Sequence, residues 1–266
     1  MKIKLSGRNH VGLVHTYNKL AKLYRESEPP RWPEAIDALK RVVEIRKVSC
    51  SEEVSQGEEK DRKDDSRDNK IKLSEALNNL GEYCHSSGVF QDAKNYLQLS
   101  YSLSADAFGE AKKELIPSLR NYALALLEVG EKDDAIEMLL KYEQLMHKIC
   151  YSDELMSSTM DMVDVYDLLS YAYLVNRSYK TAKSYLTKGT DIIVFHNGED
   201  TEEIACRKDK LAFLLFCEGE TKEAENIWLQ AKEMFLRFRG NDEFHPDVMR
   251  MVKNFAVCCC RRRPDF

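Results

Sequence analysis

The feature that most constrains this chain is internal repetition, because one pattern of residues returns at intervals of 42 to 60 residues. In each copy a leucine or aromatic residue precedes a small residue, a helix break follows about seven residues later, and an alanine lies five residues past the break. The complete copies are Leu80, Gly81, Gly88, Ala93 and Leu97; Tyr122, Ala123, Gly130, Ala135 and Leu139; and Leu211, Ala212, Gly219, Ala224 and Trp228. A fourth copy without the glycine and a looser first copy comprise Leu169, Ser170, Ala182 and Leu186, and Leu20, Ala21, Tyr24, Ala35 and Leu39. Such repetition is typical of stacked structural units.

Each copy predicts a pair of antiparallel helices. Apolar residues recur at spacings of three and four on both sides of the break, which is the period of a helix face. We expect Gly88, Gly130 and Gly219 to end the first helix in the left-handed conformation, which glycine enters freely. In the fourth copy Arg177 occupies this place, and we expect Asn176, one residue earlier, to be the left-handed residue instead. The alanine after the break indicates that the two helices approach closely there.

The composition favours an all-α fold. The chain has 266 residues with 11 glycines and 6 prolines, and leucine, alanine, glutamate and lysine dominate the periodic stretches. A β-sheet has almost no support. Because stacked repeats contact only their neighbours, they are not limited to the usual size of one core. We therefore predict one continuous solenoid over residues 1–266.

One step between repeats is longer than the others. The small residues lie at positions 21, 81, 123, 170, 212 and 256, so the first step is 60 residues and the others are 42 to 47. The segment 49–70 consists mainly of Glu, Asp, Lys, Arg and Ser, a composition that buries too little apolar surface to order itself. We predict a disordered, charged insertion there, with Ser49 and Ser51 as candidate phosphorylation sites.

The last unit is half a repeat. His245, Pro246 and Asp247 open a helix that passes through Val248 and Phe255, and no second helix follows. A lone helix of this kind commonly caps the open end of a solenoid. The alternative is that the chain is a fragment of a longer protein.

These residues resemble tetratricopeptide (TPR) repeats, and more narrowly the extended repeats of kinesin light chain type, which read His-Pro-Asp-Val and then Asn-Asn-Leu-Ala or Asn-Asn-Leu-Gly. The matching segments are Ala76 to Gly81, and His245 to Val248 with Asn254 to Ala256. The resemblance implies a right-handed superhelical solenoid of about five helical hairpins plus a C-terminal capping helix. It also implies that the first helices line a concave groove that binds a peptide or a helix of another protein. The expected fold class is thus all-α.

The resemblance also implies which residues line that groove. In the family, asparagines just before the small residue often bind the ligand backbone, and an amide offers both a donor and an acceptor. Helical register adds charged and aromatic residues on the same face, of which Tyr171 and Phe213 are natural anchors if they do not pack against a neighbouring hairpin. The candidate peptide-binding residues are Asn78, Asn79, Arg120, Asn121, Asp167, Tyr171, Lys210, Phe213, Lys253 and Asn254.

Composition and motifs argue against other functions. A net charge of −5 opposes binding to nucleic acid, for which only Arg261 to Arg263 offer a basic patch. The eight cysteines lie at spacings unlike a disulfide scaffold, no stretch has the length of a membrane span, and the six histidines lack a metal-ligand spacing. Cys84 and His85 are adjacent, so on a helix they point apart and do not form a nucleophile and base. We expect no catalytic residue, metal or cofactor.

The sequence therefore predicts a non-enzymatic scaffold or adaptor that binds a protein partner, located in the cytoplasm. The acid-poor N-terminus leaves import into an organelle open. The alternatives are a chaperone-linked or organelle assembly factor with a TPR scaffold, an RNA-binding helical repeat, and the helical domain of an enzyme. The sequence does not identify the partner or the oligomeric state.

Overall fold

The computed structural model describes residues 10–52, 61–109, 112–152, 158–242, 245–246, 248–250 and 252–253. Within these ranges all the regular secondary structure is helical and there is no strand. The expectation of an all-α fold is therefore confirmed.

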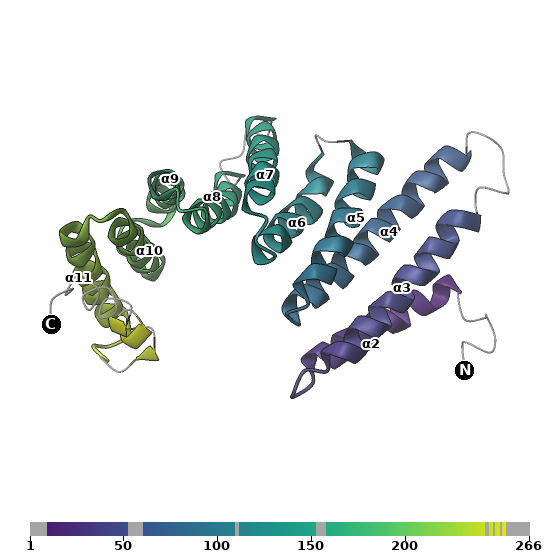
Figure 1. Cartoon of the computed structure of the whole chain (residues 1–266), viewed down its shortest axis with the longest axis horizontal. Coiled ribbons are helices and arrows are strands. Elements are labelled where there is room, and N and C mark those ends of the chain that lie inside the picture. Colours follow the sequence, from purple (N-terminus) through teal and green to yellow (C-terminus); the bar gives the residue numbers. More distant parts are fainter. Residues whose placement is uncertain are drawn as a thin grey trace. The chain divides into compact units, whose positions relative to one another are not determined.

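The chain divides into two compact units, Met1–Leu145 and Met146–Phe266 (Figure 1). The first contains η1 (Val11–Leu13), α2 (Val14–Glu26), α3 (Trp32–Glu52), α4 (Asp61–Ser86), α5 (Phe90–Phe108), η3 (Lys113–Leu115), α6 (Ile116–Glu128) and most of α7 (Lys132–Ser152). The second contains the end of α7 and α8 (Ser158–Val175), α9 (Tyr179–Asn197), α10 (Glu202–Glu218) and α11 (Thr221–Phe238). One continuous right-handed solenoid over residues 1–266 stays a prediction.

Within each unit, helices that follow one another pack in pairs. The pairs α2 and α3, α4 and α5, α8 and α9, and α10 and α11 form the helical hairpins that the repeats predict, and a short turn joins α6 to α7. Successive hairpins also pack together, through α3 with α4 and α5 with α6 in the first unit and through α9 with α10 in the second. The fold is an all-α helical repeat.

The hairpin turns share one pattern of backbone hydrogen bonds. After α10, the N–H of Gly219 donates to the carbonyl of Phe216 at 3.1 Å, and the N–H of Glu220 donates to Leu215 at 2.9 Å. The same two bonds recur at the ends of α4, α6 and α8. Gly88, Gly130 and Gly219 have φ of 82°, 86° and 98°, so the left-handed glycines are confirmed, and such bonds satisfy carbonyls at a helix end.

The turn after α8 corrects one expectation. Arg177, with φ of 60°, is the left-handed residue, and Asn176 is not. Arg177 N–H donates to Leu174 at 3.0 Å, and Ser178 N–H donates to Tyr173 at 2.8 Å, the same pattern that the glycine turns have. The two hydrogen bonds of the turn determine which residue must adopt the left-handed conformation. This requirement overrides the preference of the neighbouring asparagine for that conformation.

Small residues mark the contacts between paired helices, as expected. Ala93, Ala135, Ala182 and Ala224 are all 0% exposed. At Gly81 an added Cβ would lie 2.4 Å from Leu97 Cγ on the paired helix, so no larger residue fits without a shift. These contacts bring the apolar faces together over the cores of the two units.

Helix covers both ends of the segment that we expected to be disordered. Residues 49–52 belong to α3 and residues 61–70 to α4, and residues 53–60 lie outside the described residues. Charged residues continue these helices through intrahelical contacts such as the ion pair of Lys72 with Asp68, and Lys70 reaches Asp106 on α5 at 3.8 Å. The predicted insertion at 49–70 is thus too long at both ends.

The described part of the C-terminal half-repeat packs on the second unit. Residues 246, 248–250 and 252–253 are helical, and Val248 is 0% exposed within a core to which α8, α9, α10 and α11 contribute. This position suits the predicted capping helix. Asp247 and residues 254–266, including Asn254 and the Arg261 to Arg263 run, lie outside the described residues.

Candidate functional site

The second unit contains a cavity of about 470 Å³ lined by residues of α8, α9 and α10. Four of the ten predicted groove residues, Asp167, Tyr171, Lys210 and Phe213, line it together. The other described lining residues are Ser170, Leu174, Leu186, Asp209 and Leu214. The structure thus brings residues that are more than 40 positions apart in the sequence into one site.

The cavity combines a buried apolar floor with exposed aromatic walls. Leu186 and Leu214 are each 2% exposed, whereas Tyr171 is 46% and Phe213 is 40% exposed. Ser170 occupies the small position of its repeat, and its hydroxyl donates to the carbonyl of Ala182 at 2.9 Å, which ties α8 to α9 beneath the cavity. Large aromatic side chains that stay exposed beside an apolar hollow are suited to anchoring a partner.

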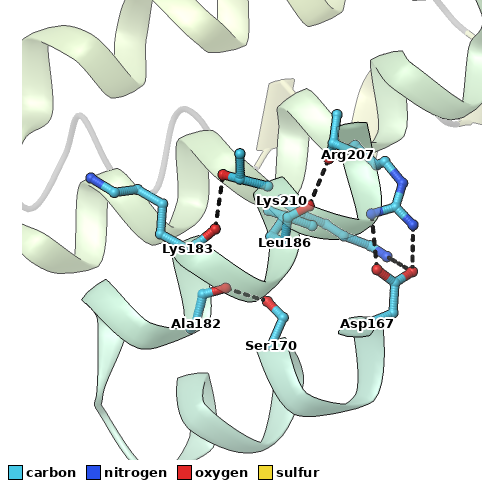
Figure 2. Close-up of polar contacts among 9 residues, drawn as sticks. Asp167, Ser170, Ala182, Lys183, Leu186, Arg207 and Lys210 are labelled. Atoms are coloured by element: carbon cyan, nitrogen blue, oxygen red, sulfur yellow. Dashed lines mark hydrogen bonds and ion pairs between the residues drawn. The ribbon is translucent and has the colours of Figure 1, made fainter. Parts of the chain in front are cut away.

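A buried ion pair fixes one charged side of the cavity (Figure 2). Arg207 of α10 is 3% exposed, and its Nη1 and Nη2 lie 2.9 Å from Oδ1 and Oδ2 of Asp167 on α8. Lys210 approaches the same carboxylate at 3.7 Å, with its side chain 59% exposed. Gly189 of α9 covers the pair, since a Cβ there would lie 3.1 Å from Arg207 Nη1. The pair therefore links α8 to α10 where Gly189 of α9 allows close approach, and it balances the charge of Asp167.

Asp209 contributes the second carboxylate of this cavity. Its Oδ1 accepts a hydrogen bond from the indole N–H of Trp228 at 2.8 Å. Burial raises the pKa of Asp209, and the hydrogen bond and the charges of Arg250 and Lys210 oppose this rise without cancelling it. The cavity therefore has charged groups that are already matched within the protein, and its free surface is mainly apolar.

The first unit contains a second set of predicted residues around a polar cluster. Asn121 Nδ2 on α6 donates to Asn78 Oδ1 on α4 at 3.1 Å and to Glu82 Oε1 at 2.6 Å. Asn78 Nδ2 donates to the same Glu82 oxygen at 3.0 Å. The two asparagines are half-buried and contact each other, so they do not face solvent freely. Part of their hydrogen-bonding capacity is therefore already used within the protein.

Two cavities adjoin this cluster. One of about 300 Å³ includes Asn78 and the exposed Asn79, and one of about 270 Å³ includes Arg120, Asn121 and Glu82. Lys253 is exposed and lines neither of these nor the cavity of the second unit. Eight of the ten predicted residues therefore form two groups of four, one in each unit, while Lys253 belongs to neither group and Asn254 lies outside the described residues.

Sequence reasoning missed Arg207, Gly189 and the apolar floor. A signal for Arg207 exists in the repeats, because it lies five residues before the small residue Ala212. At that position the second, third and fourth repeats have residues that the structure buries, namely Ala76, Ser118 and Val165, whereas Thr16 of the first repeat is exposed. An arginine aligned with such residues must find a buried partner.

The described residues offer little for chemistry. They contain no group of three or more His, Cys, Asp or Glu side chains placed to hold a metal ion. Cys84 is 1% exposed, and burial is the main cause that raises the pKa of its thiol to about 11. That thiol is protonated at neutral pH and is a poor nucleophile.

Comparison with solved structures places the fold among TPR-like repeat proteins. The TPR-like repeats assigned to a kinesin light chain of Podosopora anserina have a TM-score of 0.64 and 18% identity, over 86% of this chain and 98% of that chain. MamA from Desulfovibrio magneticus RS-1 has a TM-score of 0.55 and 15% identity, over 86% and 97%. A Rap protein complexed with Competence and Sporulation Factor has a TM-score of 0.54 and 14% identity, over 94% and 64%.

These similarities establish the fold, a TPR-type helical repeat. No protein-family model matches the chain, and no curated protein sequence matches it. Of the helices in the described residues, none combines the length and the apolar character that crossing a membrane requires.

Proposed function

We propose that this chain is a non-enzymatic interaction module, an adaptor that binds a peptide or a helix of a partner protein. The observation that carries the proposal is the cavity of the second unit, where Asp167, Tyr171, Lys210 and Phe213 lie around an apolar floor. In this proposal the first helices α8 and α10 supply the binding surface.

The chemistry of the cavity supports a polypeptide ligand with an apolar anchor. Its volume of about 470 Å³ is enough for one or two large side chains, and Tyr171 and Phe213 would cover them from both sides. Burial of these two half-exposed rings against a partner would release water from apolar surface, which favours binding. The Rap structure with Competence and Sporulation Factor gives an example of this fold in a complex.

The test is a pull-down with the full chain, followed by titration of the captured partner against variants. Tyr171→Ala with Phe213→Ala should weaken affinity by roughly tenfold or more, as expected for anchoring aromatic residues. Phe195→Ala is the matched control, because Phe195 on α9 is 70% exposed and does not line the cavity. Circular dichroism verifies that each variant is folded.

The proposal fails if the double variant binds the partner as tightly as the wild type does. It also fails if Phe195→Ala weakens binding as much as the double variant, because the partner would then contact the second helices.

A further inference from the structure

The cavity of the first unit has a chemical character that the cavity of the second unit lacks. It has a volume of about 300 Å³ and is lined by Ile71, Ser74, Glu75, Asn78, Asn79, Ser100, Ser104, Phe108, Glu114, Pro117 and Ser118. Its charged lining residues are the carboxylates of Glu75 and Glu114, and the described lining residues include no basic side chain. Among the described residues, neither carboxylate forms an ion pair or a hydrogen bond.

The described lysines near this cavity do not pair with its two carboxylates. On α4, Lys70 pairs with Asp106 at 3.8 Å and Lys72 pairs with Asp68. Lys112 and Lys113 precede Glu114 in the chain, but both are exposed and neither lines the cavity or pairs with that carboxylate. Among the described residues, the lysines near this cavity are paired with other carboxylates or do not line it, and Arg67 lies against the ring of Phe108 rather than against either glutamate. The two unpaired carboxylates therefore favour a positively charged occupant.

The remaining surface suits the rest of a long basic side chain. Ile71, Phe108 and Pro117 offer apolar surface along which an aliphatic stem can lie. The ring of Phe108 already has a cation near it, since the guanidinium carbon of Arg67 lies 5.9 Å from the ring centroid. The cavity thus has a stem-binding side and a charge-binding side.

The polar cluster beside the cavity also offers acceptors rather than donors. Glu82 Oε1 accepts amide hydrogens from both Asn78 and Asn121, and Asn121 Nδ2 uses its two hydrogens on Asn78 and Glu82. This leaves Glu82 Oε2 and the carbonyl oxygen of Asn121 as acceptors. A ligand that presents N–H groups would match them.

We propose that this cavity binds a lysine or arginine side chain of the partner polypeptide. The cationic group lies between Glu75 and Glu114, and the stem lies against Ile71 and Phe108. The inference rests on the proposed function and adds to it a basic residue as a specificity element of the partner.

The probe is a fluorescein-labelled oligoarginine peptide, with oligocitrulline of the same length as its uncharged counterpart. Fluorescence anisotropy at low ionic strength measures binding to the full chain. Glu75→Gln with Glu114→Gln should weaken oligoarginine binding about fivefold to tenfold, since each exposed carboxylate contributes a modest screened interaction. Oligocitrulline should bind more weakly than oligoarginine to the wild type and equally to both proteins.

The matched control is Asp37→Asn with Glu128→Gln, which removes the same charge from two exposed residues that line none of the three cavities. Unchanged oligoarginine binding in this control supports the site. An equal loss in both double variants would show attraction by net charge alone and would overturn the inference, as would full binding by the Glu75 and Glu114 variant.

These outcomes separate the inference from the proposed function. If the Tyr171 and Phe213 variant no longer binds the captured partner, but the Glu75 and Glu114 variant binds oligoarginine as tightly as the wild type does, only the inference fails. If the partner also binds the Tyr171 and Phe213 variant fully, the proposed function fails.

Discussion

Two arginines occupy places that the other repeats give to smaller residues. Arg177 stands in the left-handed turn position, with φ of 60°, where the turns after α4, α6 and α10 have Gly88, Gly130 and Gly219. Arg207 is 3% exposed at the position five residues before the small residue of its repeat. The two arginines lower stability in different ways. Arg177 adds backbone strain at the surface, whereas Arg207 buries a charge that requires a counter-charge. A single substitution can remove the backbone strain at Arg177, and Asp167 supplies the counter-charge for Arg207.

Arg177→Gly should raise the free energy of unfolding by about 0.5 to 1 kcal/mol, since glycine enters the left-handed region without the Cβ clash but loses more entropy on folding. Arg177→Ala removes the same side chain and keeps the strain, so it should show no gain. Reversible chemical denaturation measures both. A glycine variant no more stable than the alanine variant would contradict this account of the turn.

At the scale of helices, one register rule describes both groups of site residues. The rule counts positions back from the small residue in the first helix of each hairpin. The residue three positions before it contacts a residue in the first helix of the next hairpin, and that partner lies two positions before its own small residue. Asn78 meets Asn121 at 3.1 Å by this rule, and Asp167 meets Lys210 at 3.7 Å. These contacts follow from helix periodicity, so the sequence could predict which residues share a surface. It could not predict Arg207, because a charged residue is ordinarily expected in solvent.

Packing of α8, α9 and α10 should depend on the buried ion pair. Arg207→Met leaves Asp167 without its buried cation, and we expect a loss of about 2 to 3 kcal/mol in stability, reduced from the fully buried case because the Asp167 side chain is 30% exposed. At Gly189 an added Cβ would lie 3.1 Å from Arg207 Nη1, so we expect Gly189→Ala to lack the gain of about 1 kcal/mol that alanine usually brings to a helix interior. Thermal and chemical denaturation measure these effects.

The control is Arg31→Met, which breaks an exposed ion pair with Glu34 and a contact of the guanidinium with the Tyr24 ring, and which should change stability far less than Arg207→Met. Equal small effects of Arg207→Met and Arg31→Met would mean that the buried pair does not hold α8 and α10 together.

For the whole molecule, repetition made the fold predictable where helices have an apolar face. The prediction of paired helices depended on small residues such as Gly81, Ala93 and Ala182, because a larger residue does not fit where two helices make close contact. The expectation that a segment of low apolar content is disordered was wrong for residues 61–70, which belong to α4. Charged residues there form a helix through ion pairs and contact with α5, which a criterion based on apolar content does not detect. Which partner the cavities accept depends on chemistry outside the chain.

The central claim is that partner contact occurs at the cavity of α8, α9 and α10, and photocrosslinking tests it most directly. Benzoylphenylalanine would replace Phe213, at the cavity, or Phe195, which is exposed elsewhere on the same unit. After irradiation with the captured partner, we predict a crosslinked product from position 213 and none from position 195. A product from position 195 with none from position 213 would contradict the account.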